Sequence, residues 1–329
     1  MSFETNAPSA ETASDNSFWS ILREAVSGTE RDFTQGSLRA AIFILAVPMI
    51  IEMMAESLFA IVDIFFVSRL GSNSVAVVSI TESMMYLIYS VAIGLSIGAT
   101  ATVARRIGEK DTEGAAKAAT HSIYLGVFAS LVLGAIGVIF APVFLRLMGA
   151  DETVVAEGTT FTRIMLGGNI VVMFLFMLNA IFRGAGDAAI AMRVLWFANI
   201  MNMILAPCFI FGFWFFPQLG VTGAAIGTTL GRGLGVLFAT YKLFFGEKRF
   251  AIHANHWILD TARFWKLIKV SAPGILQFFI QTASWIGLVR VVTGFGTQAI
   301  AGYQIGIRVV IFALLPSVGL ANATATLVG

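Results

Sequence analysis

The sequence predicts an all-α, polytopic membrane helix bundle made of two parallel six-helix repeats, of which the second is incomplete. The chain of 329 residues is 57% hydrophobic before its 32 Gly are counted, whereas soluble domains reach only about 45–50% with Gly included. Its apolar runs are long enough to cross a hydrocarbon core about 30 Å thick. Residues 48–80 and 273–305 are two versions of one such segment.

The repeat aligns without a gap at an offset of 225 residues, as from Pro48 to Pro273. Identical pairs include Gly71 with Gly296, whereas Glu52 and Glu56 are matched by Gln277 and Gln281. Internal repeats of membrane-spanning length are typical of two-lobed transporters.

Eight helices are expected in order, because strands of a membrane barrel would instead give alternating segments of roughly ten residues. They lie at 41–69, 75–104, 115–145, 154–182, 189–216, 220–245, 264–295 and 298–328. Residues 41–246 form the first six-helix lobe, 247–263 a basic cytoplasmic linker, and 264–329 the first two helices of the second lobe, detached from the first. An even number of helices separates the two copies, so the lobes are parallel repeats. A complete second lobe would need further helices, so we expect a fragment or truncated product of a longer transporter.

Residues 1–40 are expected to form a polar cytoplasmic N-terminal tail without a cleavable signal peptide, because no apolar stretch lies near Met1. Residues 18–26, FWSILREAV, fit a short interfacial helix, but their setting in this polar tail favours disorder.

Lys and Arg predict the orientation, since they concentrate in cytoplasmic loops. A cytoplasmic N-terminus leaves only Arg69 and Arg146 outside and places these inside: Arg23, Arg31, Arg39, Arg105, Arg106, Lys110, Lys117, Arg183, Arg193, Lys242, Lys248, Arg249, Arg263, Lys266 and Lys269. We therefore expect a multi-pass plasma (inner) membrane protein, and the net charge of +2 gives no argument for a nucleic-acid partner. Cys208 is the single cysteine, which excludes an internal disulfide.

Three acids lie on one face of the first span, where a carboxylate is costly and is expected to serve a site. Glu52, Glu56 and Asp63 fall within about 40° of one another and extend about 16 Å along the helix. Pro48 removes a backbone hydrogen bond at the cytoplasmic end of this stripe, which predicts a kink and a hinge. Structural roles remain the alternative for these acids and are favoured for Glu82, near the outer surface. The second copy keeps only amides at Gln277 and Gln281, so the first lobe alone could exchange a proton there, or its oxygens could bind Na⁺.

Other polar residues inside the spans are weaker candidates. The fourth and fifth helices carry Asn169, Asn179, Asn199 and Asn202, which either bridge helices structurally or line a site, Asn202 being the preferred functional residue. Arg163, Arg232, Arg290 and Arg308 also lie in spans; no role is assigned to any, although one could neutralise an acid. His253 and His256 have metal-like spacing without a third ligand, which favours a solvated loop.

Several segments together resemble the multidrug and toxic compound extrusion (MATE) family over residues 32–329. They are DFTQGSLRAAIFILAVPMI, VDIFFVSRLG, GLSIGATATVARRIGEKD, FRGAGDAAIAMRV, NIMNMILAPCFIFG and GVTGAAIGTTLG, in this order. The resemblance implies twelve helices in two lobes, a central cavity, and alternating access that exchanges H⁺ or Na⁺ for amphipathic, often cationic, drug-like compounds. It implies no cofactor beyond the coupling ion, and a monomer embedded in the lipid bilayer.

The resemblance also assigns residues. Asp63 matches the cation-coupling Asp of the first helix, Asn202 the fifth-helix Asn of the DinF-like branch, and Thr228 its sixth-helix Thr, so Asp63 and Asn202 are the implied Na⁺ ligands. Ala206 and Gln281 stand where the DinF-like and NorM-like branches respectively carry an acid. Branch and coupling ion therefore stay open. The alternatives are a related flippase for lipid-linked sugars, which would need a basic cavity, and a membrane aspartyl protease, which would need a second mid-membrane Asp.

Overall fold

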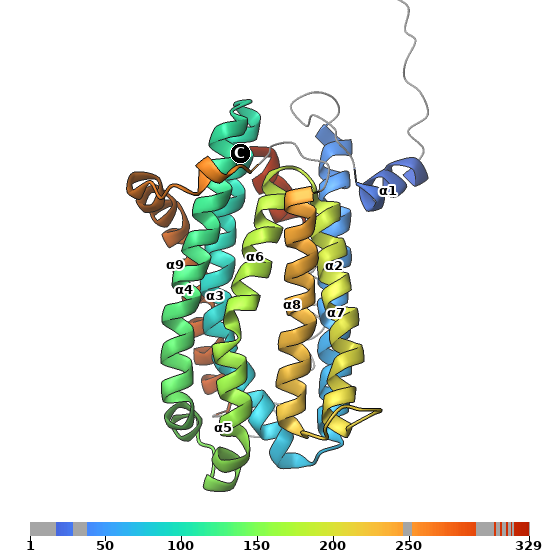
Figure 1. The fold of residues 1–329 in the computed structure, drawn as a ribbon, viewed down its shortest axis with the longest axis vertical. Helices are drawn as coiled ribbons and strands as arrows, with labels where there is room; N and C mark the ends of the chain where they lie inside the picture. Colours follow the sequence, from blue (N-terminus) through green and yellow to red (C-terminus); the bar gives the residue numbers. More distant parts are fainter. Residues whose placement is uncertain are drawn as a thin grey trace, which may run out of the picture.

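The computed structural model describes residues 18–28, 38–245, 252–293 and 319–328, together with the single positions 306, 310, 314 and 317 (Figure 1). The helices are α1 (Phe18–Ser27), α2 (Leu38–Ser68), α3 (Ser72–Gly108), α4 (Thr112–Leu147), α5 (Glu152–Gly167), α6 (Asn169–Gly184), α7 (Ala188–Phe211), α8 (Val221–Phe245), the 3-10 turn η1 (Ala254–Trp257) and α9 (Thr261–Thr293). These described parts contain helices and no strand, which confirms the predicted all-α class.

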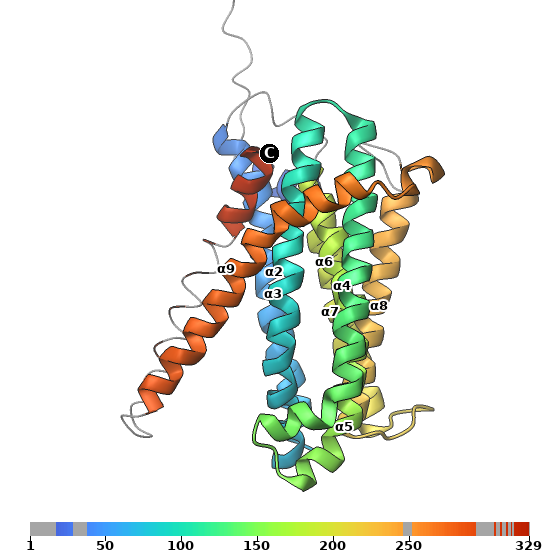
Figure 2. The same cartoon turned by 90° about the vertical axis from the view of Figure 1, so that its left-hand side faces the viewer.

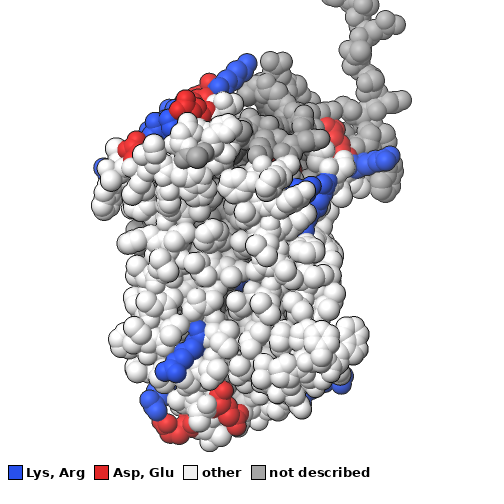
Figure 3. Space-filling model, viewed as in Figure 1, with Lys and Arg blue, Asp and Glu red and all other residues white. Residues whose placement is uncertain are grey.

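Six helical segments of the described residues are long and apolar enough to cross a membrane: α2, α3, α4, α5 with α6, α7 and α8. They stand side by side in one bundle (Figure 1). Charged side chains gather at the two ends of this bundle, and the face between them carries few charges (Figure 3). This distribution is the one that a hydrocarbon layer around the middle of the bundle requires.

Glycines on one face of α8 allow it to pack closely on α7. Gly223, Gly227, Gly231 and Gly235 recur every four residues, and a Cβ at Gly231 would lie 2.6 Å from the backbone nitrogen of Asn202. Small residues at this spacing let two membrane helices approach at the backbone. The approach places Asn202 and the α8 residues beside Gly231 within one interface.

The predicted span 154–182 is broken into two helices at Gly168, between α5 and α6. The buried side chain of Asn169 donates hydrogen bonds to the carbonyls of Ser130 (3.2 Å) and Leu166. A side chain that bonds to backbone carbonyls beside a glycine pair is a recognised cause of a helix kink. The sequence pattern of an uninterrupted apolar run did not reveal this break.

The favoured disorder of residues 18–26 is wrong, since this segment forms α1. The guanidinium of Arg193, on α7, donates hydrogen bonds to the carbonyls of Val26 (3.0 Å) and Ser27 at the end of α1. These bonds satisfy carbonyls that a helix end leaves free. A partner distant in sequence therefore fixes the helix.

The described parts after residue 260 also pack on the first lobe, contrary to the expected detachment. α9 crosses α3 obliquely (Figure 2), and a Cβ at Gly94 would lie 2.4 Å from Ile275. The hydroxyls of Ser90 and Thr282 lie 3.4 Å apart across the same contact. Ala323 packs on Leu45 and Met49 of α2. Most of the expected span 298–328 lies outside the described residues.

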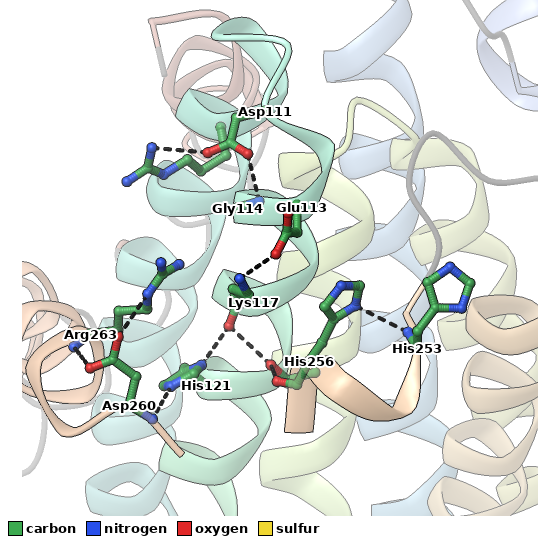
Figure 4. Close-up of polar contacts among 11 residues, drawn as sticks. Asp111, Glu113, Gly114, Lys117, His121, His253, His256, Asp260 and Arg263 are labelled. Carbon is green, nitrogen blue, oxygen red and sulfur yellow. Dashed lines mark hydrogen bonds and ion pairs between the residues drawn. The ribbon is translucent and has the colours of Figure 1, made fainter. Parts of the chain in front are cut away.

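The linker before α9 is docked on α4, so the predicted solvated loop is also wrong. His256 is buried, and its backbone carbonyl accepts a hydrogen bond of 2.9 Å from the Thr120 hydroxyl. The Tyr124 hydroxyl donates to the carbonyl of Trp257 (2.6 Å), and the Nε2 atom of His121 accepts from the backbone N–H of Asp260 (3.0 Å; Figure 4). These bonds fix where α9 begins.

Candidate functional site

The candidate site lies inside the first lobe, where the acids of α2 meet residues of α3, α6 and α8. Glu52 is buried, and its Oε1 atom lies 3.1 Å from the Nη1 atom of Arg183, at the end of α6. The Glu52 and Arg183 side chains are only 5% and 10% exposed, so both partners are buried. The pair is neutral as a unit and joins α2 to α6.

Glu56, one turn further along α2, has a different partner. Its Oε2 atom lies 3.9 Å from the Nη2 atom of Arg232, on α8. Arg232 is buried, donates a hydrogen bond of 3.0 Å to the Tyr89 hydroxyl, and lies 5.7 Å from the centre of the Phe59 ring. The Phe59 ring and both the ring and the hydroxyl of Tyr89 thus hold Arg232 beside Glu56.

Asp63 is the acid of α2 that makes no ion pair with a described residue, whereas Glu52 and Glu56 each pair with an arginine. Its Oδ1 atom is buried and has no hydrogen-bond partner among the described residues. Arg232 attracts Asp63 electrostatically, and Glu82 of α3 lies close enough to repel it. Glu82 itself is exposed on α3 in this chain.

These charges do not balance. Glu56, Asp63 and Glu82 are three carboxylates around one guanidinium, Arg232, so the cluster carries two excess negative charges when every acid is ionised. The Asp63 Oδ1 atom is a buried part of this cluster, and a buried carboxylate whose charge is not compensated takes up a proton or a cation. The cluster therefore has the chemistry of a cation-binding site.

The predicted amides and hydroxyl are buried in the lobe. Asn179, Asn199, Asn202 and Thr228 are each less than 9% exposed. Both side-chain polar atoms of Asn202 lack a hydrogen-bond partner in the described residues, as do the Asn179 Oδ1 and Asn199 Nδ2 atoms. No hydrogen bond joins Asn202 to any of the three acids among the described contacts.

The remaining predicted residues lie elsewhere. Gln277 and Gln281 are exposed on α9. Pro48 lies inside α2, a helix of 31 residues that continues on both sides of it. Arg163 is exposed and donates to the carbonyl of Val138 (3.3 Å). The side chain of Arg290 and the whole of Arg308 lie outside the described residues.

Sequence reasoning missed two residues of this cluster, Arg183 and Tyr89. Arg183 was counted among the cytoplasmic cations, because it borders the GAGD turn at 184–187. Its position at the end of an apolar run was the available signal that its long side chain could reach back into the lobe. Tyr89 gave no signal, because an aromatic residue in an apolar span is unremarkable in sequence.

The chain matches known transporters along most of its length. The MatE family model matches residues 48–208. The probable multidrug resistance protein NorM of Thermotoga maritima is 28% identical over 89% of the chain, and the FAD transporter of Shewanella oneidensis is 28% identical over 80% of it. The chain spans 63% and 58% of the lengths of these two relatives.

Solved structures share the fold as well. A MOP superfamily transporter from Pyrococcus furiosus superposes with a TM-score of 0.82 at 29% identity, over 90% of this chain and 65% of that one. The outward-facing structure of a multidrug resistance MATE family transporter gives the same values. The family model, the relatives and the shared helical fold agree, and together they support a MATE family, multi-pass membrane protein.

Proposed function

We propose that the chain forms the first lobe, and the beginning of the second, of a secondary active antiporter. It exports amphipathic, cationic drug-like compounds in exchange for H⁺ or Na⁺ by alternating access between two lobes. Two of the similar proteins, an FAD transporter and a multidrug resistance MATE family transporter, carry the name of transporters, which supports a non-catalytic role. The N-terminus is cytoplasmic, and the antiporter works as a monomer in the plasma membrane.

The observation that carries this proposal is the excess of carboxylates in the first lobe. Glu56, Asp63 and Glu82 face the single guanidinium of Arg232. In a two-state carrier, a proton or Na⁺ bound to one of these acids would stabilise one conformation more than the other, which is the condition for coupling. Asp63 is the coupling residue, because it makes no ion pair with a described residue, unlike Glu52 and Glu56, and its Oδ1 atom has no competing hydrogen bond.

The other acids have lesser roles in this proposal. Glu52 is compensated by Arg183 and fixes α2 in the lobe. Glu56 holds Arg232 near Asp63, and release of that contact would leave Arg232 free to pair with Asp63. The Asn202 Oδ1 atom, also without a hydrogen bond, is the amide oxygen that we propose as a second ligand if the ion is Na⁺.

The test is transport in vesicles by the full-length antiporter under an imposed H⁺ or Na⁺ gradient. Asp63→Asn should abolish gradient-driven efflux at unchanged expression, because an amide replaces the carboxylate at nearly constant volume. Glu56→Gln should weaken coupling, because it installs the residue that the second copy carries at Gln281. Unchanged ion-dependent transport by both variants would refute the proposal.

A second candidate is export of an anionic dinucleotide, which the similarity to the FAD transporter favours. The two candidates differ in the charge of the substrate. Efflux of a fluorescent organic cation, competed with unlabelled cation or with FAD, distinguishes them. The excess of carboxylates near Arg232 favours competition by the cation.

A further inference from the structure

A pocket of about 220 Å³ lies at the end of the lobe that carries the linker, away from the acids of α2. The last turns of α3 (Ala101 to Arg106), the start of α4 (Gly114, Ala118 and His121) and the start of α9 (Arg263 to Val270) line it. The pocket is smaller than the roughly 300–1,000 Å³ of sites for drug-sized ligands. Its occupant is therefore a small group or the head of a larger molecule.

The charges that line the pocket are all positive. Arg105, Arg106, Arg263 and Lys266 contribute cations, and no Asp or Glu is among the lining residues of the described chain. Ala101, Leu267 and Val270 add an apolar part to the wall. An anionic group attached to an apolar chain would therefore match both the cationic and the apolar residues of this lining.

Acids outside the pocket orient all three arginines without using all of their N–H groups. The Nη1 atom of Arg106 pairs with Glu109 at 3.0 Å and with Asp111 at 3.1 Å. The Nε atom of Arg105 pairs with Glu109 at 2.9 Å, and the Nε atom of Arg263 pairs with Asp260 at 2.9 Å. A guanidinium carries five N–H donors, so the terminal nitrogens of Arg105 and Arg263 remain available. Figure 4 shows Arg263 held in this way by Asp260, beside His121.

Lys266 is the cation in the lining that has no ion pair with any described residue. It lies on α9 one turn after Arg263 and is exposed. With the acids Glu109, Asp111 and Asp260 counted against the four cations, the surroundings keep one net positive charge. The N–H of Gly114, at the start of α4, already donates to the Asp111 carboxylate (2.7 Å), so the side-chain cations are the free positive groups of the pocket.

We propose that this pocket binds a phosphate group, carried by the headgroup of an anionic phospholipid or by a free phosphate ion. Basic pockets between membrane helices bind anionic headgroups, and this pocket lies at the end of α3 and α4, two of the apolar spans. The occupant bridges the α3–α4 turn to α9. It thereby stabilises the contact between the first lobe and the first helix of the second.

The experiment measures thermal unfolding of the purified chain in detergent, titrated with phosphatidylglycerol, phosphatidylcholine or inorganic phosphate. We expect a saturable rise of the melting temperature with phosphatidylglycerol and none with phosphatidylcholine. A saturable rise with inorganic phosphate alone would also support the phosphate site and would assign it to a free ion. A rise that is equal for both lipids would overturn the proposal.

Three variants connect the effect to the pocket. Lys266→Gln should raise the half-saturating concentration of the effective ligand about fivefold, as expected for the loss of one juxtamembrane cation. Lys266→Arg should restore the original value. Lys269→Gln is the matched control, because Lys269 is exposed on the same helix but does not line the pocket. Equal titrations for Lys266→Gln and Lys269→Gln would overturn the proposal.

Discussion

At the scale of single residues, partners decide what the acids of α2 can do. Glu52 and Glu56 lie one turn apart on the same helix, yet Glu52 is compensated at 3.1 Å by Arg183 and Glu56 only at 3.9 Å by Arg232. Burial of a charge is tolerated where an opposite charge is in contact. The difference separates a structural acid from acids that are available for coupling.

The buried pair predicts a strong dependence of stability on both partners. Glu52→Gln or Arg183→Met should each lower the free energy of unfolding by about 3–5 kcal/mol, because each leaves one buried charge alone. The double variant should cost less than the sum of the two. Unfolding curves in mixed detergent measure all three.

The matched control is the exposed pair of Arg146 and Glu152, whose side chains are 52% and 76% exposed. Glu152→Gln should leave the unfolding curve nearly unchanged, since water already solvates both charges. A Glu52→Gln variant as stable as Glu152→Gln would contradict the assigned role of the buried pair.

At the scale of elements, the glycine face of α8 sets the distance to α7. Gly231→Ala should destabilise the protein by about 1–3 kcal/mol, because its Cβ would lie 2.6 Å from the Asn202 backbone nitrogen and force the helices apart. Gly233→Ala is the control, since no atom lies within 4 Å of that position. Thermal unfolding compares them, and equal melting temperatures would show that this contact does not limit packing.

The start of α9 should depend on pH. The Asp260 carboxylate accepts hydrogen bonds from the backbone N–H groups of Arg263 (3.3 Å) and Ala262 (2.9 Å), and these bonds, with the Arg263 guanidinium, hold the pKa of Asp260 below its usual value. A lowered pKa in the folded state means that ionised Asp260 stabilises the helix start above the ordinary pKa of about 3.9. That stabilisation is lost as the pH falls through the lowered value.

Hydrogen exchange of the first turn of α9 measures this effect, after correction for the intrinsic dependence of exchange on pH. Protection at pH 7 should decrease below about pH 4. Asp260→Asn should show weaker protection that does not change with pH in this range. A wild-type profile without a pH dependence would exclude Asp260 as the titrating cap.

At the scale of the whole molecule, α9 joins the first lobe through its contact with α3. The Ser90 and Thr282 hydroxyls lie 3.4 Å apart across this contact. If the proposed antiporter works by moving one lobe against the other, the contact must change during transport. A disulfide at this position should therefore stop the cycle.

Ser90→Cys with Thr282→Cys, made in a Cys208→Ser background, tests this expectation in the full-length antiporter. Oxidation should abolish efflux, and reduction should restore it. Thr81→Cys with Thr162→Cys is the control, because these hydroxyls lie 2.8 Å apart between α3 and α5 of the same lobe. Full efflux by the oxidised Ser90–Thr282 variant would mean that α3 and α9 stay together throughout transport.

The sequence by itself determined the all-α membrane bundle and the face of α2 that carries its acids. Hydropathy and helical periodicity depend on residues that are near one another in the chain, and local sequence records them directly. Pro48 and Pro273, at matching positions of the repeat, each lie inside a helix of more than 30 residues. The resemblance in the ordered segments likewise pointed to the family that the comparisons support.

Only the tertiary structure decided which charges meet. Glu52 and Arg183 are 131 residues apart in sequence, and their contact depends on how α2 packs against α6. Three other features depend in the same way on partners from other elements. They are the break at Gly168, the docking of the linker on α4, and the hydrogen bonds from Arg193 to the end of α1. Such contacts follow from the angles and separations at which helices pack, and no spacing within one segment records them.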